Sequence, residues 1–233
     1  MYEEKIIPPK KSMPQAVDGT LRKFALRVPE VIYQCSGIIV FGKRIKSFVF
    51  STDLSIIKNV NADAIIAVYP FTPQPIITQA LLLAADIPVF AGVGGGLTKG
   101  QRVVNLAMFA EMQGATGVVL NAPTASTVVS HVAETIDIPV VLTVARADTD
   151  FDESIRAGAD IFNVSAAAET PAIVRSIRER YPDVPIIATG GPTDESILET
   201  IKAGANAITW TPPSNGEIFR DIMAAYRENK PHP

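Results

Sequence analysis

Two turns rich in glycine and serine carry the clearest chemical signal in this sequence. Gly190 and Gly191 follow the apolar run IIAT, and Ser214 opens the turn SNG soon after the run ITW. The unpaired backbone N–H groups at the start of a helix, together with the helix dipole, attract an anion. Because a helix is expected after each turn, Gly190, Gly191 and Ser214 are predicted to bind a phosphate or another anion. The alternative is that they only make tight turns.

A third segment, GVGGGLTKG, holds five glycines in nine positions, among them Gly94, Gly95 and Gly96. Such a segment indicates either a mobile lid over a ligand or a concave backbone that binds an anion, with Lys99 beside it. Passive flexibility is the alternative. The segment is not a P-loop, because glycine follows Lys99 where the motif GxxxxGK[ST] needs serine or threonine.

Few residues are suited to acid–base catalysis. Asp53 comes directly after an apolar run and is our best candidate for a catalytic base, and Lys99 is the second catalytic candidate. Asp53 also stands where a helix is expected to begin, so its carboxylate could serve as an N-cap instead. Both roles are left open by the sequence.

Two amide side chains stand inside apolar runs. Asn121 ends GVVLN and Asn163 interrupts IFNV. A buried amide needs hydrogen-bond partners. We expect Asn121 and Asn163 to bond each other or to bind a ligand.

The sequence predicts neither a metal nor a cofactor. The segment RADTDFDES holds three acids at alternate positions, but it lacks the spacing of a calcium loop, and helix capping is the favoured interpretation. Histidine occurs only at His131 and His232, and Cys35 is the single cysteine, so no transition-metal spacing is present.

A repeating unit of about fifty residues must position these side chains. Small-residue prefaces such as Gly158-Ala159-Asp160 alternate with acid–apolar–proline prefaces such as Asp137-Ile138-Pro139, and each kind recurs every 44 to 53 residues. Strands that alternate with helices favour a parallel sheet, and we predict a (βα)8 TIM barrel. An open doubly wound sheet is the alternative. The expected strands are 47–51, 64–69, 88–92, 117–121, 139–144, 160–164, 185–189 and 207–211.

The chain is expected to form one domain, with residues 1–46 as an N-terminal arm and residues 47–233 as the barrel. Apolar periodicity predicts a helix over 19–35, although Pro29 should kink or break it. GIIVF and SFVFS are expected to pair as a hairpin around the turn GKR, and SFVFS is taken as the first barrel strand. The helix and the first arm of the hairpin would cap the bottom of the barrel.

Composition excludes several classes of protein. The chain has 233 residues, 47% hydrophobic, and no apolar stretch reaches the roughly 18 residues of a membrane span. The net charge of −3 argues against a nucleic-acid-binding protein. One cysteine permits no internal disulfide, which favours a cytoplasmic location. Residues 1–46 carry nine basic and four acidic side chains, which indicates a solvated surface or a patch for an acidic partner.

The segment GGPTDESILETIKAGANAITWTPPS resembles the ribulose-phosphate-binding barrels, which include phosphoribosyl anthranilate isomerase and keto-deoxy-phosphogluconate aldolase. The resemblance implies a phosphate-binding role for Gly190, Gly191, Thr211 and Ser214. The sequence departs from the pattern at Pro212-Pro213, which removes two N–H donors. The whole chain also resembles a group of bacterial barrels often labelled hydrolases, through AVYPFTP, GVGGGLTKG and IIATGGPT.

Two functions remain open at this point. The first is an enzyme that acts on a small phosphorylated or otherwise anionic metabolite, with isomerase or lyase chemistry favoured over hydrolysis. The second is a barrel that binds such a metabolite without catalysis, as a sensor or regulator. The expected partner is the small anionic metabolite, with no membrane or nucleic acid; a homo-oligomer is left open.

Overall fold

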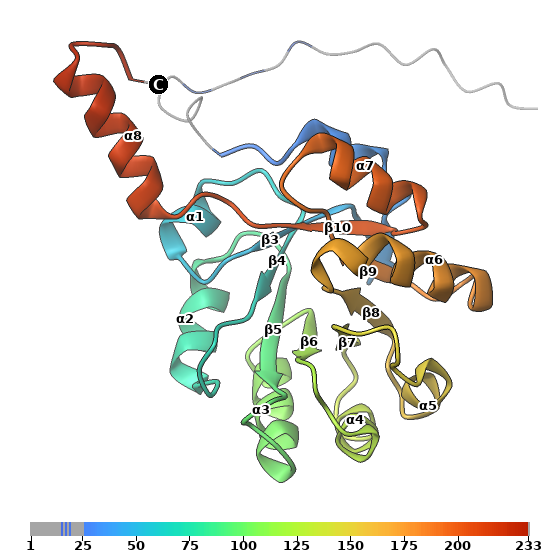
Figure 1. Cartoon of the computed structure of the whole chain (residues 1–233). Coiled ribbons are helices and arrows are strands. Elements are labelled where there is room, and N and C mark those ends of the chain that lie inside the picture. The colour runs from blue at the N-terminus through green and yellow to red at the C-terminus, as the bar shows by residue number, and fades with distance from the viewer. Residues whose placement is uncertain (1–14, 16, 18, 20–25, 233) are drawn as a thin grey trace, which may run out of the picture.

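The computed structural model describes residues 15, 17, 19 and 26–232, and they form a closed barrel of eight parallel strands (Figure 1). The order around the ring is β10-β3-β4-β5-β6-β7-β8-β9. The predicted (βα)8 fold is confirmed, and the open sheet is excluded because β10 pairs with both β3 and β9. The barrel strands are β3 (Ser47–Phe50), β4 (Ala64–Ala67), β5 (Val89–Gly94), β6 (Gly117–Leu120), β7 (Val140–Val144), β8 (Ile161–Val164), β9 (Ile186–Thr189) and β10 (Ala207–Trp210).

A helix follows each strand, as the repeating unit predicts. The N-termini of the helices therefore lie at the end of the barrel where the strands have their carboxyl ends. We call this end the mouth. The helices are α1 (Leu54–Lys58), α2 (Pro75–Ala84), α3 (Gln101–Met112), α4 (Ser126–Ala133), α5 (Phe151–Arg156), α6 (Thr170–Arg180), α7 (Asp194–Lys202) and α8 (Asn215–Arg227).

Alternating strand residues supply two apolar layers. One set fills the inside of the barrel, including Phe48, Phe90 and Ile187. The other set packs outward under the helices, including Ile65 and Val118. Strands that are buried on both faces explain why the sequence shows continuous apolar runs.

The hairpin predicted between GIIVF and SFVFS is wrong, because a different segment pairs with GIIVF. β1 (Ile38–Val40) pairs antiparallel with β2 (Lys43–Ile45), while β3 joins only the barrel. Phe41 and Gly42 form the two-residue turn, both with positive φ, as tight hairpins require. Ile38 and Ile45 pack against the inner side chains, so the hairpin covers the end of the barrel opposite the mouth.

The helix expected over 19–35 is also wrong where it can be compared; residues 20–25 lie outside the described part of the chain. Leu26 makes a parallel bridge to Val60, and a short 3-10 helix, η2 (Glu30–Gln34), begins only after Pro29. A proline disfavours helical backbone in the residue before it, which explains why the helical segment begins only after Pro29. Ile32 is fully buried, and η2 packs beside α7 on the outer wall (Figure 1).

The last helix, α8, leads away from the barrel instead of lying along it (Figure 1). None of its residues is buried. No helix in the described part of the chain is long and apolar enough to cross a membrane.

Candidate functional site

Short polar side chains line the inside of the barrel near the mouth. Side chains alternate between the two faces of a strand, so positions two residues apart share a face. Val141, Ile161, Ile187 and Ala207 belong to the inner apolar cluster. The next inward positions toward the mouth on the same strands are Thr143, Asn163, Thr189 and Thr209, which we call the polar layer.

The polar layer is only partly bonded within the chain. The Asn163 amide nitrogen donates to the Thr143 hydroxyl at 3.3 Å, and the Thr189 hydroxyl donates to Ser165 Oγ at 3.2 Å. Because the Thr143 hydroxyl can both donate and accept, the Asn163 amide can present either its oxygen or its NH2 group to the barrel axis.

Two atoms of this layer are buried and have no partner within the described chain. They are Asn163 Oδ1 and Thr209 Oγ1, on side chains that are 8% and 6% exposed. A buried polar atom without a hydrogen bond costs about 1–3 kcal/mol. The two residues lie on β8 and β10, with β9 between them. An amide and a hydroxyl therefore face the barrel axis with unused hydrogen-bonding capacity.

Three cavities open at the mouth. One, of about 500 Å³, is lined by Thr143, Arg146 and Asp148. A second, of about 240 Å³, is lined by Tyr69, Gly94–Thr98 and Asn121. Ala122 borders both, so these two are neighbours. A third, of about 360 Å³, is lined by Gly95 and Lys99. Asn121 and the predicted glycines Gly94, Gly95 and Gly96 are thus brought together, whereas Asn163 bonds to Thr143 and lines none of these cavities.

Asp53 is held by four hydrogen bonds. Its Oδ1 accepts from the backbone N–H groups of Ser55 and Ile56 and from the Ser55 hydroxyl, at 2.8, 3.3 and 2.7 Å. Its Oδ2 accepts from Asn215 Nδ2 at 2.5 Å. The Ser55 hydroxyl, followed by these backbone and amide donors, lowers the pKa of Asp53. The N-cap interpretation is confirmed, and these contacts weaken Asp53 as a base.

The glycine-rich loop is joined to the neighbouring loop by its own backbone. Gly95 N–H donates to the Thr98 carbonyl at 3.0 Å, and Gly96 N–H donates to the Pro123 carbonyl at 3.1 Å. An added Cβ on Gly95 would lie 2.0 Å from the Asn121 carbonyl oxygen. These contacts favour a fixed turn over a lid or an anion-binding backbone. The Lys99 side chain is exposed beside it.

The turn before α8 is closed by a carboxylate of the chain itself. Ser214 N–H donates to a Glu217 carboxylate oxygen at 2.8 Å, and the Ser214 hydroxyl donates to the same oxygen at 2.7 Å. These two bonds, the hydroxyl first, lower the pKa of Glu217. An anion at Ser214 or beside Thr211 would have to compete with this carboxylate.

The turn before α7 is similar. Thr193 and Ser196 form a reciprocal capping box. Gly190 packs tightly, since an added Cβ would lie 2.8 Å from both Ile197 and Ile208, and its N–H is directed at the Thr209 carbonyl at 3.5 Å. Gly191 has a φ of +81°. Close packing and turn geometry therefore account for both glycines.

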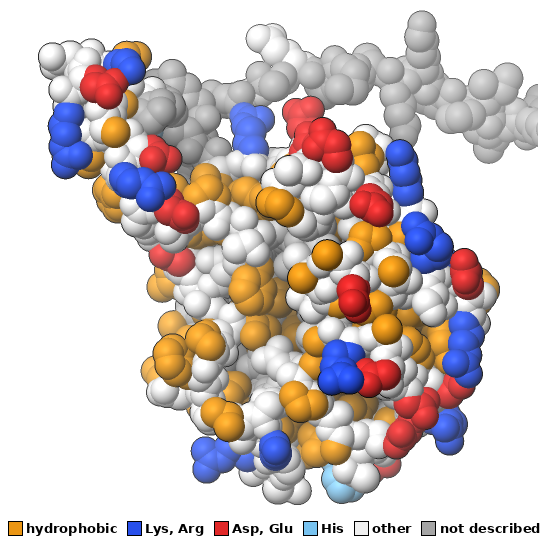
Figure 2. Space-filling view, in the orientation of Figure 1, with side chains coloured by type: hydrophobic (Ala, Val, Ile, Leu, Met, Phe, Trp, Pro, Cys, Tyr) orange, Lys and Arg blue, Asp and Glu red, His pale blue; other side chains and the backbone are white. Residues whose placement is uncertain are grey.

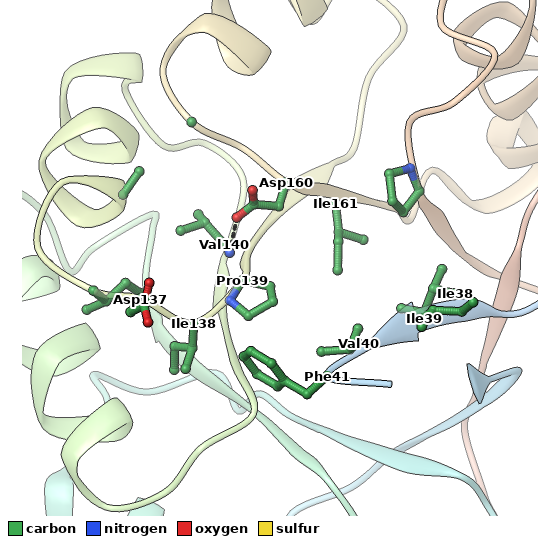
Figure 3. A pocket seen from close by; sticks show the side chains of 14 residues that line it. Ile38, Ile39, Val40, Phe41, Asp137, Ile138, Pro139, Val140, Asp160 and Ile161 are labelled. Atoms are coloured by element: carbon green, nitrogen blue, oxygen red, sulfur yellow. Dashed lines mark hydrogen bonds between the residues drawn. The ribbon is translucent and has the colours of Figure 1, made fainter. Parts of the chain in front are cut away.

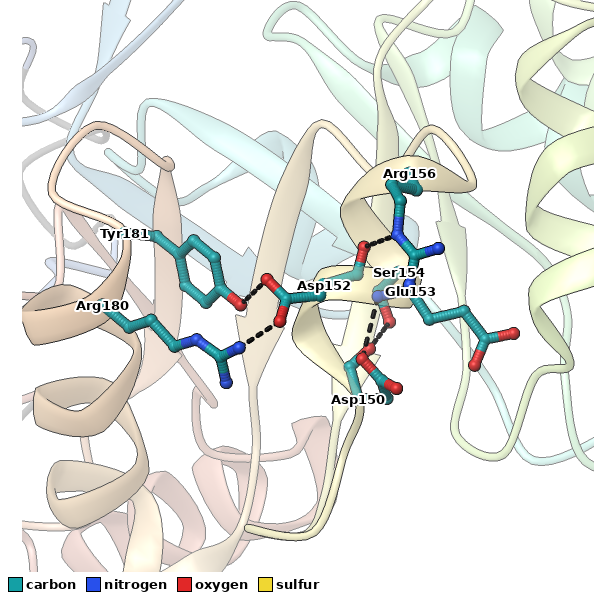
Figure 4. Close-up of polar contacts among 7 residues, drawn as sticks. All are labelled: Asp150, Asp152, Glu153, Ser154, Arg156, Arg180 and Tyr181. Atoms are coloured by element: carbon teal, nitrogen blue, oxygen red, sulfur yellow. Dashed lines mark hydrogen bonds and ion pairs between the residues drawn. The ribbon is translucent and has the colours of Figure 1, made fainter.

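The acidic segment after β7 divides its carboxylates among separate partners (Figure 4). Asp150 caps α5 by accepting from Glu153 N–H at 2.8 Å, and Asp152 bonds to Arg180 and Tyr181. Asp148 pairs with Arg146 through two bonds, at 2.7 and 2.9 Å. Within the described residues, no group of three or more His, Cys, Asp or Glu could hold a metal ion.

Carboxylates outnumber cationic groups in the loops at the mouth. Carboxylates repel an approaching anion, and the repulsion weakens as salt screens it. Counting these loops and the first turns of the helices that follow them, the acidic residues are Asp53, Asp148, Asp150, Asp152, Glu153, Glu169, Asp194, Glu195 and Glu217, and the basic ones are Lys99, Arg102 and Arg146.

A further groove, of about 590 Å³, lies at the opposite end of the barrel (Figure 3). The hairpin residues Ile39 and Phe41 line one side, and Ile138 and Pro139 line the other. Asp160, the carboxylate drawn there, accepts the Val140 N–H at 2.8 Å and so fixes the start of β7. Active sites of TIM barrels form at the mouth, so this groove is not a candidate for the catalytic site.

Comparison with known protein families and with curated proteins gives no match. Solved structures are similar in fold. A protein named as a phosphonomutase, from Burkholderia cenocepacia J2315, is 15% identical with a TM-score of 0.60, over 78% of this chain and 93% of that one. A phosphonopyruvate hydrolase in complex with oxalate and Mg²⁺ is 13% identical with a TM-score of 0.58, over 80% and 84% of the two chains.

A 4-hydroxy-tetrahydrodipicolinate synthase from Methylacidiphilum fumariolicum SolV is 17% identical with a TM-score of 0.59, over 81% of this chain and 75% of that one. At these identities the likeness shows the fold alone. The chain is a (βα)8 barrel, and several barrels of similar shape are named as enzymes.

Of the polar layer, only Asn163 was among the site residues predicted from the sequence. Asn163 is recognisable as an amide inside an apolar strand, but Thr189 and Thr209 look like ordinary strand residues, since threonine is common in strands. Both are recognised as inward-facing only once the structure shows that Ile187 and Ala207, two residues earlier, fill the inside of the barrel.

Proposed function

We propose that this protein is an enzyme that binds a small carboxylate metabolite at the mouth of the barrel. Two buried atoms without a partner in the described chain, Asn163 Oδ1 and Thr209 Oγ1, carry the proposal. A hydroxyl and an amide NH2 donate hydrogen bonds to a carboxylate, and the amide oxygen accepts one from a hydroxyl group of the ligand. Binding inside a barrel removes water and so strengthens each of these bonds.

A singly charged carboxylate fits this mouth better than a phosphate does. The inward residues are neutral, and Glu217 occupies the turn where a phosphate was expected. The complex of phosphonopyruvate hydrolase with oxalate is an example of a similar barrel that holds a carboxylate. The resemblance of residues 190–214 to the ribulose-phosphate-binding barrels supports isomerase or lyase chemistry over hydrolysis.

The cellular location is not tested by the structure, and a cytoplasmic location stays a prediction from the sequence.

The second candidate is a barrel that binds the metabolite without catalysis. It is favoured by the state of Asp53, whose carboxylate is bonded on both oxygens and has a lowered pKa. In addition, the eight barrel strands, which all lie in the described part of the chain, contain no lysine for a Schiff base.

Thermal shift with defined probes separates these functions. Oxalate, pyruvate, ribulose 5-phosphate and inorganic phosphate are each added to the full-length protein, and the ligand is recovered after incubation. We expect a carboxylate to raise the melting temperature more than phosphate does, and Thr209→Val to abolish the rise. A consumed ligand supports the enzyme, and an unchanged one supports the sensor. A response to phosphate alone, or one that survives Thr209→Val, overturns the proposed site.

A further inference from the structure

Hydrogen bonds hold the first turn of helix α8, yet little of the described part of the chain packs against the rest of the helix. Pro212 and Pro213 stiffen the segment that leads to it. Ser214 and Glu217 cap its first turn, and Asn215 bonds to Asp53 and Ser55 beside α1. These contacts fix the base of the helix, while its body leads away from the barrel (Figure 1).

The exposed side of α8 carries a stripe of large apolar side chains. Phe219, Met223 and Tyr226 follow one another at intervals of four and three residues, so they share one face. They are 64%, 42% and 47% exposed. We call these three residues the α8 stripe.

The usual place for an eighth helix on the barrel wall is already filled. In a (βα)8 barrel the last helix packs beside α7, and here η2 packs there, with Val31 and Ile32 buried. If α8 packed on the barrel wall beside α7 to bury its stripe, it would have to displace η2.

A second stripe with the same spacing lies on α2. Ile76, Ala80 and Leu83 occupy its exposed side, with Ile76 66% and Leu83 81% exposed. The helix α2 contains no charged residue, and Figure 2 shows hydrophobic side chains gathered over it. A helix that is apolar on all sides is typically buried. We call these residues the α2 stripe; like the α8 stripe, it spans about 10 Å along its helix axis.

We propose that two copies of this chain form a dimer in which the α8 stripe of each packs on the α2 stripe of the other. A two-fold arrangement makes this contact twice, because each copy supplies both stripes. At about 200 Å² per large side chain, the exposed fractions give roughly 600 Å² per copy. The total of about 1,200 Å² is at the lower limit of stable interfaces. Each stripe alone exposes about 300 Å², so the dimer depends on both contacts forming together.

Sedimentation of the full-length protein across the micromolar range tests the proposal. We expect a mass of twice 24.9 kDa. Met223→Glu and Leu83→Glu should each weaken the dimer by roughly 30-fold or more, the effect of losing a central interface residue. Ile39→Glu is the matched control, since Ile39 is an apolar residue on the hairpin whose exposure, 63%, lies between those of Met223 and Leu83. A monomeric wild type, or a control that dissociates equally, overturns the proposal.

A mixture of two single-cysteine variants tests which stripes meet. Met223→Cys protein is mixed with Leu83→Cys protein under oxidising conditions, so that a disulfide between the two positions can form only between copies. The native Cys35 is buried and does not interfere. We expect the mixture to give a cross-linked dimer and each variant alone to give none. Cross-linking of Met223→Cys with itself would show that α8 pairs with α8, and would overturn the assignment to α2.

Discussion

Two buried threonines with opposite hydrogen-bonding states give a direct test of the polar layer. The Thr200 hydroxyl donates to the Ser196 carbonyl at 3.0 Å inside α7, whereas Thr209 Oγ1 has no partner in the described chain. Thr200→Val should lower the free energy of unfolding by about 1 kcal/mol, because a made bond is lost. Thr209→Val should leave it unchanged or raise it. Urea denaturation without ligand measures both, and equal losses would show that Thr209 is bonded.

Asp53 joins the first and last loops of the mouth, and its removal should cost stability in a pH-dependent way. Asp53→Ala should lower the free energy of unfolding by about 0.5–2 kcal/mol at neutral pH, and Asp53→Asn by less, because asparagine also caps helices. The pKa of Asp53 is lowered in the folded state. Its stabilising contribution is therefore present above its unfolded pKa of about 3.9 and is lost as the pH falls through the lower folded value.

Denaturation of wild type and Asp53→Ala at a series of pH values measures this difference. A gap that persists at the acid end would contradict the capping role of the carboxylate. Asp53→Asn serves a second purpose, since it keeps the fold. If Asp53 is a catalytic base, this variant loses turnover while its melting temperature stays close to that of wild type.

At the scale of the element, the loop after β5 depends on one glycine far more than on its neighbour. Gly95 has a φ of +107° and lies against the Asn121 backbone, whereas Gly96, with a φ of +63°, has open space around it. Gly95→Ala should destabilise the fold by more than about 2 kcal/mol, and Gly96→Ala by about 1 kcal/mol, since only left-handed backbone strain remains. Thermal unfolding compares the two, and a similar loss would show that the loop can move aside.

Strands and helices were predictable where local patterns decide them. All eight barrel strands lie within two residues of their predicted bounds, because buried parallel strands require continuous apolar runs. The hairpin was paired wrongly because GIIVF offers no polar alternation to mark its turn, and Phe41 adopts a backbone that phenylalanine rarely takes. The capping box of Ser214 and Glu217 was visible as S-x-x-E, and it bears directly on the expected anion site.

The candidate site was less predictable than the fold, because unused hydrogen-bonding capacity depends on contacts between distant strands. Asn163 could be selected as an amide in an apolar strand. Nothing in the sequence distinguishes Thr209, which has no partner, from Thr200, which bonds within its own helix. The same limit applies to the glycines, since the close approach of Gly95 to Asn121 exists only once β5 and β6 are paired.

At the scale of the whole molecule, the acidic mouth makes a prediction about salt. Carboxylates surround an inner layer of neutral side chains, so an anionic ligand is repelled on approach and bound by uncharged donors. Its affinity should rise with ionic strength, because salt screens the repulsion at the exposed rim more than it screens bonds inside the barrel. Calorimetric titration of the responding carboxylate at low and high salt measures this. A fall in affinity would indicate a cationic site.

Because η2 packs beside α7, where the last barrel helix would usually lie, and α8 leads away from the barrel, truncation at the two ends of the chain should have different effects. A protein that stops after Pro213 keeps every strand and the whole inner wall, so it should still fold, although it loses the bonds of Asn215 to Asp53 and Ser55. A protein that starts at Ser36 lacks Val31 and Ile32 and leaves the outer surface beside α7 bare. The segment that contains η2 therefore covers the barrel wall as a helix usually does, and the apolar face of α8 is left exposed for contact with another molecule.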